Sequence, residues 1–210
     1  MTEQMKKKLF KGISNVIAGL DTNAISEDRK KVLQPLIDYV KEKMEQDLPI
    51  RLNFICTHNS RRSHLSQIWA QTMASYYGIK QVSCYSGGTE ATAMFPKVGE
   101  TLINQGFKIS KLSKEDNPVY SIKFSQNEPS VIAFSKQFGD DFNPSSEFAA
   151  IMTCSSADEV CPMVLGCDKR IAITYEDPKK SDGTPLQTET YLNRSLEIAT
   201  EMKFVFSRLN

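Results

Sequence analysis

The feature that most constrains this chain is an apolar, strand-like run that passes into a polar octet and then into a helical pattern. The run covers 50–55, the octet extends from Cys56 to Ser63 (Cys-Thr-His-Asn-Ser-Arg-Arg-Ser), and helical spacing follows from Leu65. A loop between a strand and a helix points successive backbone N–H groups at one spot, where the helix dipole also favours negative charge. The octet therefore predicts an anion-binding loop that begins with a cysteine.

Two side chains of the octet suggest what this loop does. A thiolate at Cys56 is stabilised by the surrounding N–H groups, which makes the sulfur a nucleophile at neutral pH. The planar guanidinium of Arg62 can bind two oxygens of a tetrahedral oxyanion. We therefore expect covalent chemistry on a bound oxyanion. A Cys–His protease is disfavoured, because the only histidines, His58 and His64, are expected to face solvent or to pack the loop.

Beyond the loop, strand and helix patterns alternate. The expected strands are 50–55, 81–86, 148–153 and 170–175, and helical stripes run from Leu65 to Tyr76, through Val98 and Leu102, and from Leu192 to Leu209. This alternation predicts an α/β fold with a four-stranded parallel sheet and helices on both faces. Ligands bind such sheets at the carboxyl ends of the strands. Cys56, Cys154 and Asp177 each follow a strand end, so they are expected to converge.

Two parts of the chain fall outside the alternation. Residues 1–48 are predicted to form a helical hairpin, with Ser26 as the N-cap of its second helix. This N-terminal extension would pack on the core or form a homodimer. Residues 49–210 would form the catalytic domain. Within that domain, 108–147 is predicted to be an insertion with a β-hairpin whose turn is 126–129.

Composition narrows the class of protein. Lys and Arg total 26 and Asp and Glu total 25, so the net charge of +1 shows no nucleic-acid footprint. No apolar run approaches the ~18 residues needed to span a bilayer, and the N-terminal segment lacks the apolar region of a signal peptide. The five cysteines are expected to be thiols. We expect a soluble cytoplasmic protein that binds neither nucleic acid nor membrane and needs no cofactor or metal.

These residues resemble those of a known family, the low-molecular-weight phosphotyrosine phosphatases and the thioredoxin-coupled arsenate reductases that share their fold. The resemblance covers roughly 50–110 and 146–208. It implies that Cys56 is the nucleophile, that Ser63 hydrogen-bonds the thiolate, and that Asp177, followed by a proline, is the general acid. The oxyanion-binding residues would be Thr57, His58, Asn59, Ser60, Arg61 and Arg62, with Arg62 also catalytic and Asn59 shaping the loop.

A segment late in the chain resembles the reductases alone. It holds Cys154 and Cys161, and the resemblance implies that arsenate is reduced to arsenite through a relay of Cys56, Cys154 and Cys161 reset by a thioredoxin-type dithiol. Ser156 followed by Glu159 is a capping-box pattern, which predicts a short helix between the two later cysteines. Seven helical residues span about 10 Å, whereas a disulfide needs Cα atoms within about 7 Å. The relay therefore requires that helix to unwind.

Other interpretations stay open. The protein could be a low-molecular-weight tyrosine phosphatase that uses Cys56, Arg62 and Asp177 on phosphate esters, or a non-enzymatic oxyanion or redox sensor. Cys154 and Cys161 could be core thiols. A zinc site that adds Cys167 is disfavoured by wide spacing and by the lack of a nearby histidine.

The octet and its surroundings also depart from the family pattern. His58 stands where the family usually has glycine. The predicted loop backbone is therefore in question if this position needs a positive φ, which glycine adopts more readily than histidine. Arg61 replaces a second loop cysteine found in many members. Gln67 replaces an acidic residue, so a monovalent-cation site is in doubt. Lys179 stands where tyrosine phosphatases typically have an aromatic residue, which favours the reductase.

Overall fold

The computed structural model describes residues 9–160 and 163–209. Its helices are α1 (Lys11–Gly19), α2 (Glu27–Glu45), α3 (Arg62–Tyr76), α4 (Pro96–Asn104), α5 (Ser155–Val160) and α6 (Gln187–Ser207), with the short 3-10 helices η1 (Thr22–Ala24) and η2 (Pro178–Ser181). Its strands are β1 (Ile50–Cys56), β2 (Val82–Gly88), β3 (Lys108–Lys111), β4 (Tyr120–Lys123), β5 (Val131–Ala133), β6 (Phe148–Met152) and β7 (Cys167–Ala172).

The central sheet has the order β2-β1-β6-β7, and all of its neighbouring strands are parallel. In the described part of the chain this is the four-stranded parallel sheet that the alternation predicted. Strand β7 begins at Cys167, three residues earlier than predicted, with a register irregularity where it starts beside Phe148. The amides of Ile173 and Tyr175 continue its pairing by donating to the carbonyls of Met152 and Thr153.

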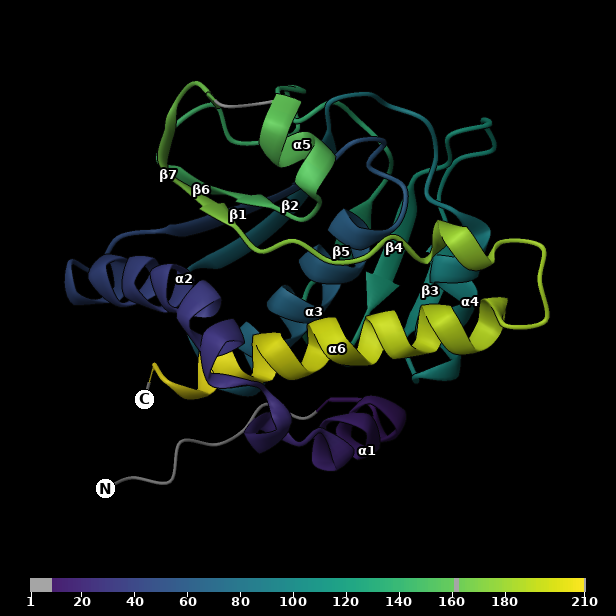
Figure 1. The fold of residues 1–210 in the computed structure, drawn as a ribbon, viewed down its shortest axis with the longest axis horizontal. Helices are drawn as coiled ribbons and strands as arrows, with labels where there is room; N and C mark the ends of the chain where they lie inside the picture. Colours follow the sequence, from purple (N-terminus) through teal and green to yellow (C-terminus); the bar gives the residue numbers. More distant parts are fainter. Residues whose placement is uncertain (1–8, 161–162, 210) are drawn as a thin grey trace.

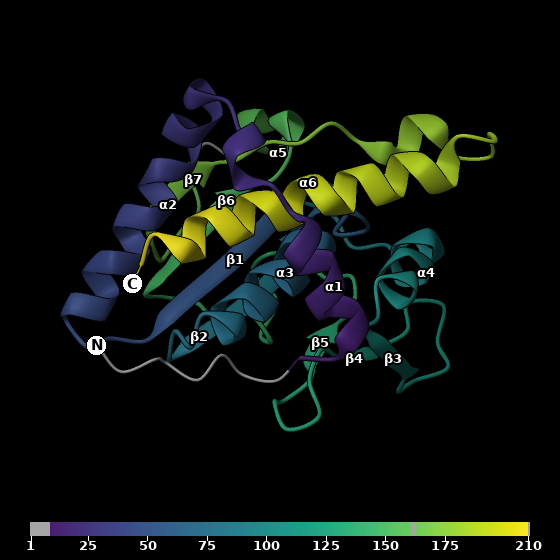
Figure 2. The same ribbon diagram turned by 90° about the horizontal axis from the view of Figure 1, so that it is seen from below.

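Helices cover both faces of this sheet, as predicted. Figure 1 shows α5 on one side of the sheet and α3 and α6 on the other, and Figure 2 shows α2 beside α6. Leu52 and Phe54 of β1 point into the core beneath α3 and α6, whereas Ile55 points into a smaller cluster that includes Ala157 of α5. Because apolar side chains are needed on both faces, β1 is a nearly continuous apolar run rather than an alternating one.

The predicted β-hairpin forms from β4 and β5, which are antiparallel. A third strand, β3, pairs with β4 and makes a small antiparallel sheet that the sequence did not predict. Strand β3 (Lys-Ile-Ser-Lys) is mostly exposed and its one apolar residue, Ile109, is half-buried, so it carries little apolar periodicity. This sheet sits against α3 and α4, away from β6 and β7 (Figure 1).

Two N-terminal helices are present as predicted, and the N-cap of α2 is Ser26, whose Oγ accepts from the amide of Arg29 at 3.2 Å. Both helices contribute to the same buried core as α6, through residues such as Ile13 and Leu36. The division into an extension (1–48) and a catalytic domain (49–210) stays a prediction. No helix in the described ranges is long and apolar enough to cross a membrane.

Candidate active site

The backbone of the Cys56–Ser63 octet turns between β1 and α3 with its carbonyl groups facing outward. The carbonyl of Thr57 accepts from the amide of Glu90 at 2.8 Å, that of His58 accepts from the hydroxyl of Ser135 at 2.9 Å, and that of Ser60 accepts from the amide of Phe95 at 3.0 Å. Among the residues that the structure describes, no N–H group from 57 to 61 donates to a protein acceptor. These amides are therefore available to an anion.

Asn59 shapes the turn. It is buried and has a φ of +44°, and its Oδ1 accepts from the amide of Lys136 at 2.9 Å. A positive φ occurs at Asn59 and not at His58, so the histidine in place of glycine causes no backbone strain. Gly88 completes the turn from β2, since a Cβ there would lie 2.6 Å from the Thr57 carbonyl oxygen and 2.7 Å from the Asn59 amide nitrogen.

Ser63 connects this turn to the sulfur. Its Oγ lies 3.1 Å from Cys56 Sγ and accepts from Asn59 Nδ2 at 2.8 Å. Because Asn59 Oδ1 is taken by the Lys136 amide, the orientation of the Asn59 side chain is determined, and its NH₂ must face Ser63. The hydroxyl proton of Ser63 is then free to be donated to the sulfur. Cys56 itself is 4% exposed.

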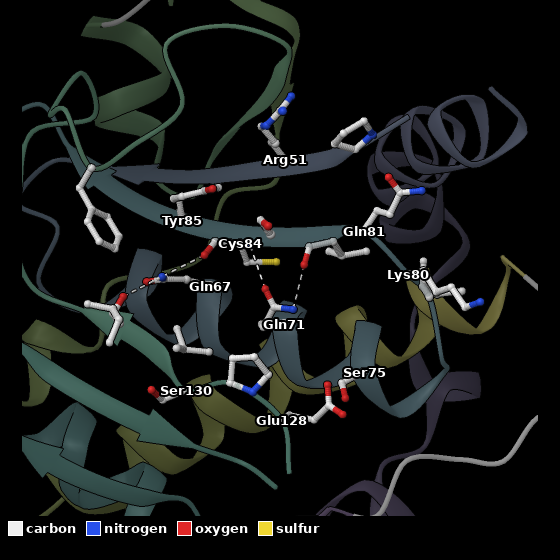
Figure 3. A pocket seen from close by; sticks show the side chains of 18 residues that line it. Arg51, Gln67, Gln71, Ser75, Lys80, Gln81, Cys84, Tyr85, Glu128 and Ser130 are labelled. Carbon is white, nitrogen blue, oxygen red and sulfur yellow. Dashed lines mark hydrogen bonds between the residues drawn. The ribbon is translucent and has the colours of Figure 1, made fainter. Parts of the chain in front are cut away.

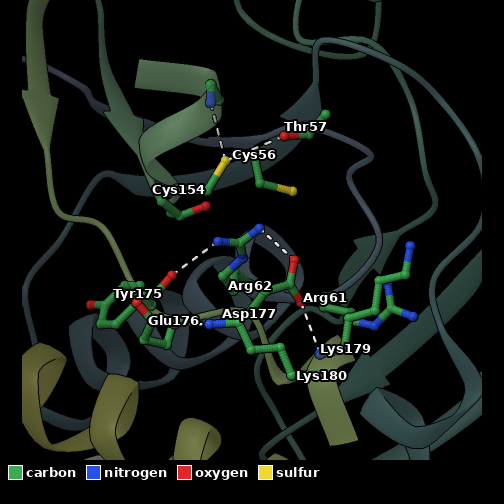
Figure 4. Close-up of polar contacts among 12 residues, drawn as sticks. Cys56, Thr57, Arg61, Arg62, Cys154, Tyr175, Glu176, Asp177, Lys179 and Lys180 are labelled. Atoms are coloured by element: carbon green, nitrogen blue, oxygen red, sulfur yellow. Dashed lines mark hydrogen bonds and ion pairs between the residues drawn. The ribbon is translucent and has the colours of Figure 1, made fainter. Parts of the chain in front are cut away.

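Arg62, the first residue of α3, meets Asp177, which follows the last strand of the central sheet. Arg62 NH2 lies 2.6 Å from Asp177 Oδ2, and Arg62 NH1 donates to the carbonyl of Tyr175 at 2.9 Å (Figure 4). Asp177 also caps η2, because its Oδ1 accepts from the amide of Lys179 at 3.0 Å. Asp177 thus occupies one N–H of Arg62 NH2, and an oxyanion that bound through that N–H would have to replace Asp177.

Arg61 has partners that the sequence did not single out. Its Nε donates to the Tyr191 hydroxyl at 2.6 Å, its NH2 donates to Asp182 at 2.7 Å, and its guanidinium lies 4.2 Å from the centre of the Phe95 ring. The side chain that was predicted to bind oxyanion thus ties the loop to α4, α6 and the segment after η2. Nothing in the local sequence of Asp182 or Tyr191 marks them as its partners.

Cys154 lies beside the loop at the start of α5. Its side chain is buried in the same cluster as Cys56, and its Sγ lies 3.5 Å from Thr57 Oγ1 (Figure 4). The amide of Ala157 donates to Cys154 Sγ at 3.3 Å, so the cysteine takes the capping position predicted for Ser156, which lies inside the helix. The short helix after Cys154 is confirmed. Cys161 lies outside the described residues.

Neither histidine is placed to act as a base. His58 is half exposed, with Nε2 3.5 Å from Glu90 Oε2. His64 is fully buried, with Nδ1 3.2 Å from Ser86 Oγ. Burial and the nearby charge of Lys136 lower the pKa of His64 to about 3, so the ring is neutral at physiological pH. Burial also lowers the pKa of Lys136 to about 8.

Of the remaining described cysteines, Cys84 belongs to the main core cluster, whereas Cys167 packs against the cluster that holds Cys56 and Cys154. Cys84 is buried in β2 and Cys167 is half-buried in β7, and burial raises the pKa of each thiol. No cluster of His, Cys, Asp or Glu side chains that could hold a metal ion occurs in 9–160 or 163–209. The zinc alternative also requires Cys161, which is outside these ranges.

Gln67, which replaces an acidic residue of the family, is buried between the two sheets. Its Nε2 donates to the carbonyls of Cys84 (3.1 Å) and Ile132 (3.2 Å) and so joins the edges of β2 and β5 (Figure 3). A cavity of about 670 Å³ opens beside it, and the residues that line the cavity include none from Cys56 to Ser63. This cavity is therefore not the site of the thiol chemistry.

The site segment is similar to known proteins. Residues 51–127 match the family model described as low molecular weight phosphotyrosine protein phosphatase, whereas no curated protein matches the chain. Solved structures with similarity include an arsenate reductase from Archaeoglobus fulgidus (TM-score 0.49, 21% identity, covering 74% of this chain and 98% of that chain). Also similar is a low molecular weight protein tyrosine phosphatase from T. tengcongensis (TM-score 0.48, 18% identity, covering 76% of this chain and 97% of that chain). A third similar structure is the YwlE arginine phosphatase from Geobacillus stearothermophilus (TM-score 0.48, 17% identity, covering 77% of this chain and 93% of that chain).

The family model covers the whole octet and the strand and helix on either side of it. It continues to residue 127, inside the segment predicted to be an insertion, and ends before Cys154 and Asp177. The match confirms the resemblance to the low molecular weight phosphotyrosine protein phosphatase family that the sequence predicted.

Proposed function

We propose that the protein is an arsenate reductase in which Cys56 forms a covalent bond to arsenic and Cys154 and Cys161 carry the electrons away. The observation that carries this proposal is the position of Cys154. A second buried thiol next to Thr57 Oγ1 and in one cluster with Cys56 suits a relay between sulfurs. A phosphate-ester hydrolase has no need of that thiol.

Binding would begin with the oxyanion entering the loop. The free N–H groups of 57–61 would hold its oxygens, and Arg62 NH2 would change partner from Asp177 to the anion. Arg62 NH1 can keep its bond to the Tyr175 carbonyl during this exchange. The carboxyl group of Asp177 is thereby released next to the bound anion.

The first chemical step joins sulfur to arsenic. The Cys56 thiolate attacks arsenic(V), and one oxygen leaves as water with a proton supplied by Asp177. Ser63, whose hydroxyl proton is free to be donated to the sulfur, would stabilise the thiolate before attack. Arsenic remains in its oxidised state at this stage, bound to Cys56.

The second step transfers two electrons. The Cys154 thiolate attacks the sulfur of Cys56, the sulfur–arsenic bond breaks, and its electron pair leaves with arsenic as arsenite. Cys161 then attacks Cys154, which frees Cys56 and leaves a Cys154–Cys161 disulfide. One arsenate is reduced and one pair of thiols is oxidised. A thioredoxin-type dithiol would reduce that disulfide, in a cytoplasm that keeps thiols reduced.

Helix α5 must open for the relay to finish. It occupies 155–160, between the two cysteines, and such a helix holds its ends farther apart than a disulfide allows. A helix of six residues loses few hydrogen bonds when it unwinds, so the opening costs little. Cys154 Sγ would give up the amide of Ala157 in the same motion.

The test is arsenate-dependent oxidation of NADPH in the presence of thioredoxin and its reductase. Cys154→Ser should lower multiple turnover by on the order of 10³-fold or more, because the arsenylated Cys56 cannot be resolved. Cys84→Ser, a buried thiol away from the loop, is the matched control and should retain activity. A wild-type protein that shows no arsenate-dependent oxidation would contradict the proposal.

A phosphatase is the second candidate, and the geometry around Arg62 favours it independently of Cys154. Cys56, Ser63, Arg62 and Asp177 form a complete set for phosphate-ester hydrolysis. An aryl-phosphate assay distinguishes the two functions, because Cys154→Ser should leave hydrolysis intact. Oxyanion binding with neither activity would indicate a sensor.

A further inference from the structure

The carboxylate of Glu201 on α6 is buried and links the N-terminal part of the chain to the active-site segment. Arg29 of α2 donates to it twice, from Nε to Oε1 at 2.6 Å and from NH2 to Oε2 at 2.9 Å. The hydroxyl of Tyr175 donates to Oε2 at 2.7 Å. Glu201 is 3% exposed, so these partners replace the water that it would otherwise bind.

Tyr175 carries this network to the oxyanion loop. Its carbonyl accepts from Arg62 NH1 at 2.9 Å, and it lies two residues before Asp177 (Figure 4). The guanidinium of Arg29 also lies 5.0 Å from the centre of the Tyr175 ring. Tyr175 is therefore held from both ends, by Arg29 and Glu201 at the ring and by Arg62 at the backbone.

The Tyr175 hydroxyl, the Glu201 carboxylate and the Arg29 guanidinium are held in fixed donor and acceptor roles. Burial, together with the charge of Glu201, raises the pKa of Tyr175 well above its usual value, so the hydroxyl remains a donor. A bidentate guanidinium–carboxylate pair has a defined orientation. Removing Arg29 would leave a buried carboxylate whose remaining donor among the described residues is the Tyr175 hydroxyl, and such a group draws its surroundings toward it or takes up a proton.

We propose that Arg29, which lies outside the family-matched segment 51–127, is a positioning residue for the oxyanion site. Through Glu201 and Tyr175 it holds the carbonyl that anchors Arg62 NH1. That anchor lets Arg62 NH2 exchange Asp177 for an oxyanion while the guanidinium stays in place. The inference rests on the proposed function for turnover, but its binding consequence holds whether the protein reduces arsenate or hydrolyses phosphate esters.

The test is the affinity for inorganic phosphate, measured by calorimetry, in Arg29→Met and in a matched control, Lys203→Met. Lys203 also joins α6 to the N-terminal helices, since its Nζ donates to the carbonyls of Ile17 (2.8 Å) and Leu20 (2.7 Å), but it does not contact Tyr175 or Arg62. Each variant loses a polar contact between α6 and the N-terminal helical region, so both should have a lower melting temperature than the wild-type protein. Only Arg29→Met should weaken phosphate binding, by roughly tenfold.

Two further variants keep the proposal testable if Arg29→Met folds poorly. Arg29→Lys keeps the charge and should restore part of the affinity. Tyr175→Phe keeps the carbonyl that Arg62 uses and removes only the hydroxyl, so it should weaken phosphate binding as Arg29→Met does. Arg29 and Tyr175 act through one network, so their effects should not add. The phosphate affinity of the double variant Arg29→Met/Tyr175→Phe should therefore lie within about twofold of that of the weaker-binding single variant.

The possible results separate this inference from the proposed function. Equal phosphate affinities in Arg29→Met and Lys203→Met, or no change in Tyr175→Phe, would overturn the role of Arg29. A protein that binds phosphate, loses that affinity in Arg29→Met and shows no arsenate reduction would support the role of Arg29 and contradict the reductase.

Discussion

Arg62 and Asp177, which are 115 residues apart in the sequence, form an ion pair with a nitrogen–oxygen distance of 2.6 Å. In the proposed function this pair joins the cation that would bind the oxyanion to the acid that would protonate its leaving oxygen.

Asp177→Asn should separate binding from chemistry. Oxyanion affinity should rise a few-fold, because Arg62 NH2 no longer has a carboxylate to give up, whereas kcat should fall by about 10²–10⁴-fold for want of a proton donor. Steady-state kinetics together with phosphate titration measure both. Glu176→Gln, which removes an exposed pair with Lys180, is the control and should change neither. Unchanged kcat in Asp177→Asn would exclude Asp177 as the acid.

Ser63→Ala should lower kcat by roughly 10- to 100-fold with little change in phosphate affinity, because it removes a donor to the Cys56 sulfur and none to the anion. The matched control is Ser66→Ala on the same helix. Ser66 is buried, and its hydroxyl has no hydrogen-bond partner among the described residues, so its loss should leave kcat unchanged. Equal effects of the two substitutions would show that Ser63 acts through packing alone.

Arg61→Met should lower the free energy of unfolding by about 1–3 kcal/mol, because Asp182 and the Tyr191 hydroxyl lose a partly buried charged partner. Urea unfolding measures this change. Lys180→Met, which removes an exposed pair in the same region, should change stability by less than about 0.5 kcal/mol. The 176–183 segment should also be cut faster by protease in Arg61→Met. No change in either measurement would show that Arg61 does not tie the loop to that segment.

Acid should destabilise the protein through His64. The pKa of this histidine is about 3 in the folded protein, against a usual value of about 6.5, so its contribution to stability is complete above about pH 6.5 and decreases as pH falls toward 3. The expected slope between pH 6 and 4 is about 1.4 kcal/mol per pH unit for one proton. His64→Gln should flatten the curve of unfolding free energy against pH by that amount. An unchanged slope would mean that His64 does not resist protonation.

Oxidation should unfold α5. In the reduced protein the amides of Ala157 and Asp158, which donate to Cys154, should be protected from hydrogen exchange, and formation of a Cys154–Cys161 disulfide should remove that protection, since the helix cannot span a bridged pair. Mass spectrometry of exchange in both redox forms checks this. Cys161→Ser should keep the protection under oxidising conditions. Equal protection of α5 in the two forms of the wild-type protein would contradict the relay.

Much of the fold was predictable because it depends on local patterns. The apolar run of β1, the helical stripe of α3 and the N-cap at Ser26 are each set by residues that are close together in the sequence. Each of them is present as predicted. Strand β3 was missed because its mostly exposed residues have no apolar period, and the cap of α5 was misplaced by two residues because a cysteine thiol took the role expected of a serine hydroxyl.

The sequence by itself determined the oxyanion loop, since the cysteine, the arginine and the strand-to-helix junction are contiguous. Only the tertiary structure decided what surrounds the loop. Arg61 meets Tyr191 across 130 residues, and Arg29 meets Glu201 across 172. Such pairs leave no periodic signal, because the position of each partner depends on how α6 packs over the sheet, and that packing depends on the whole buried core.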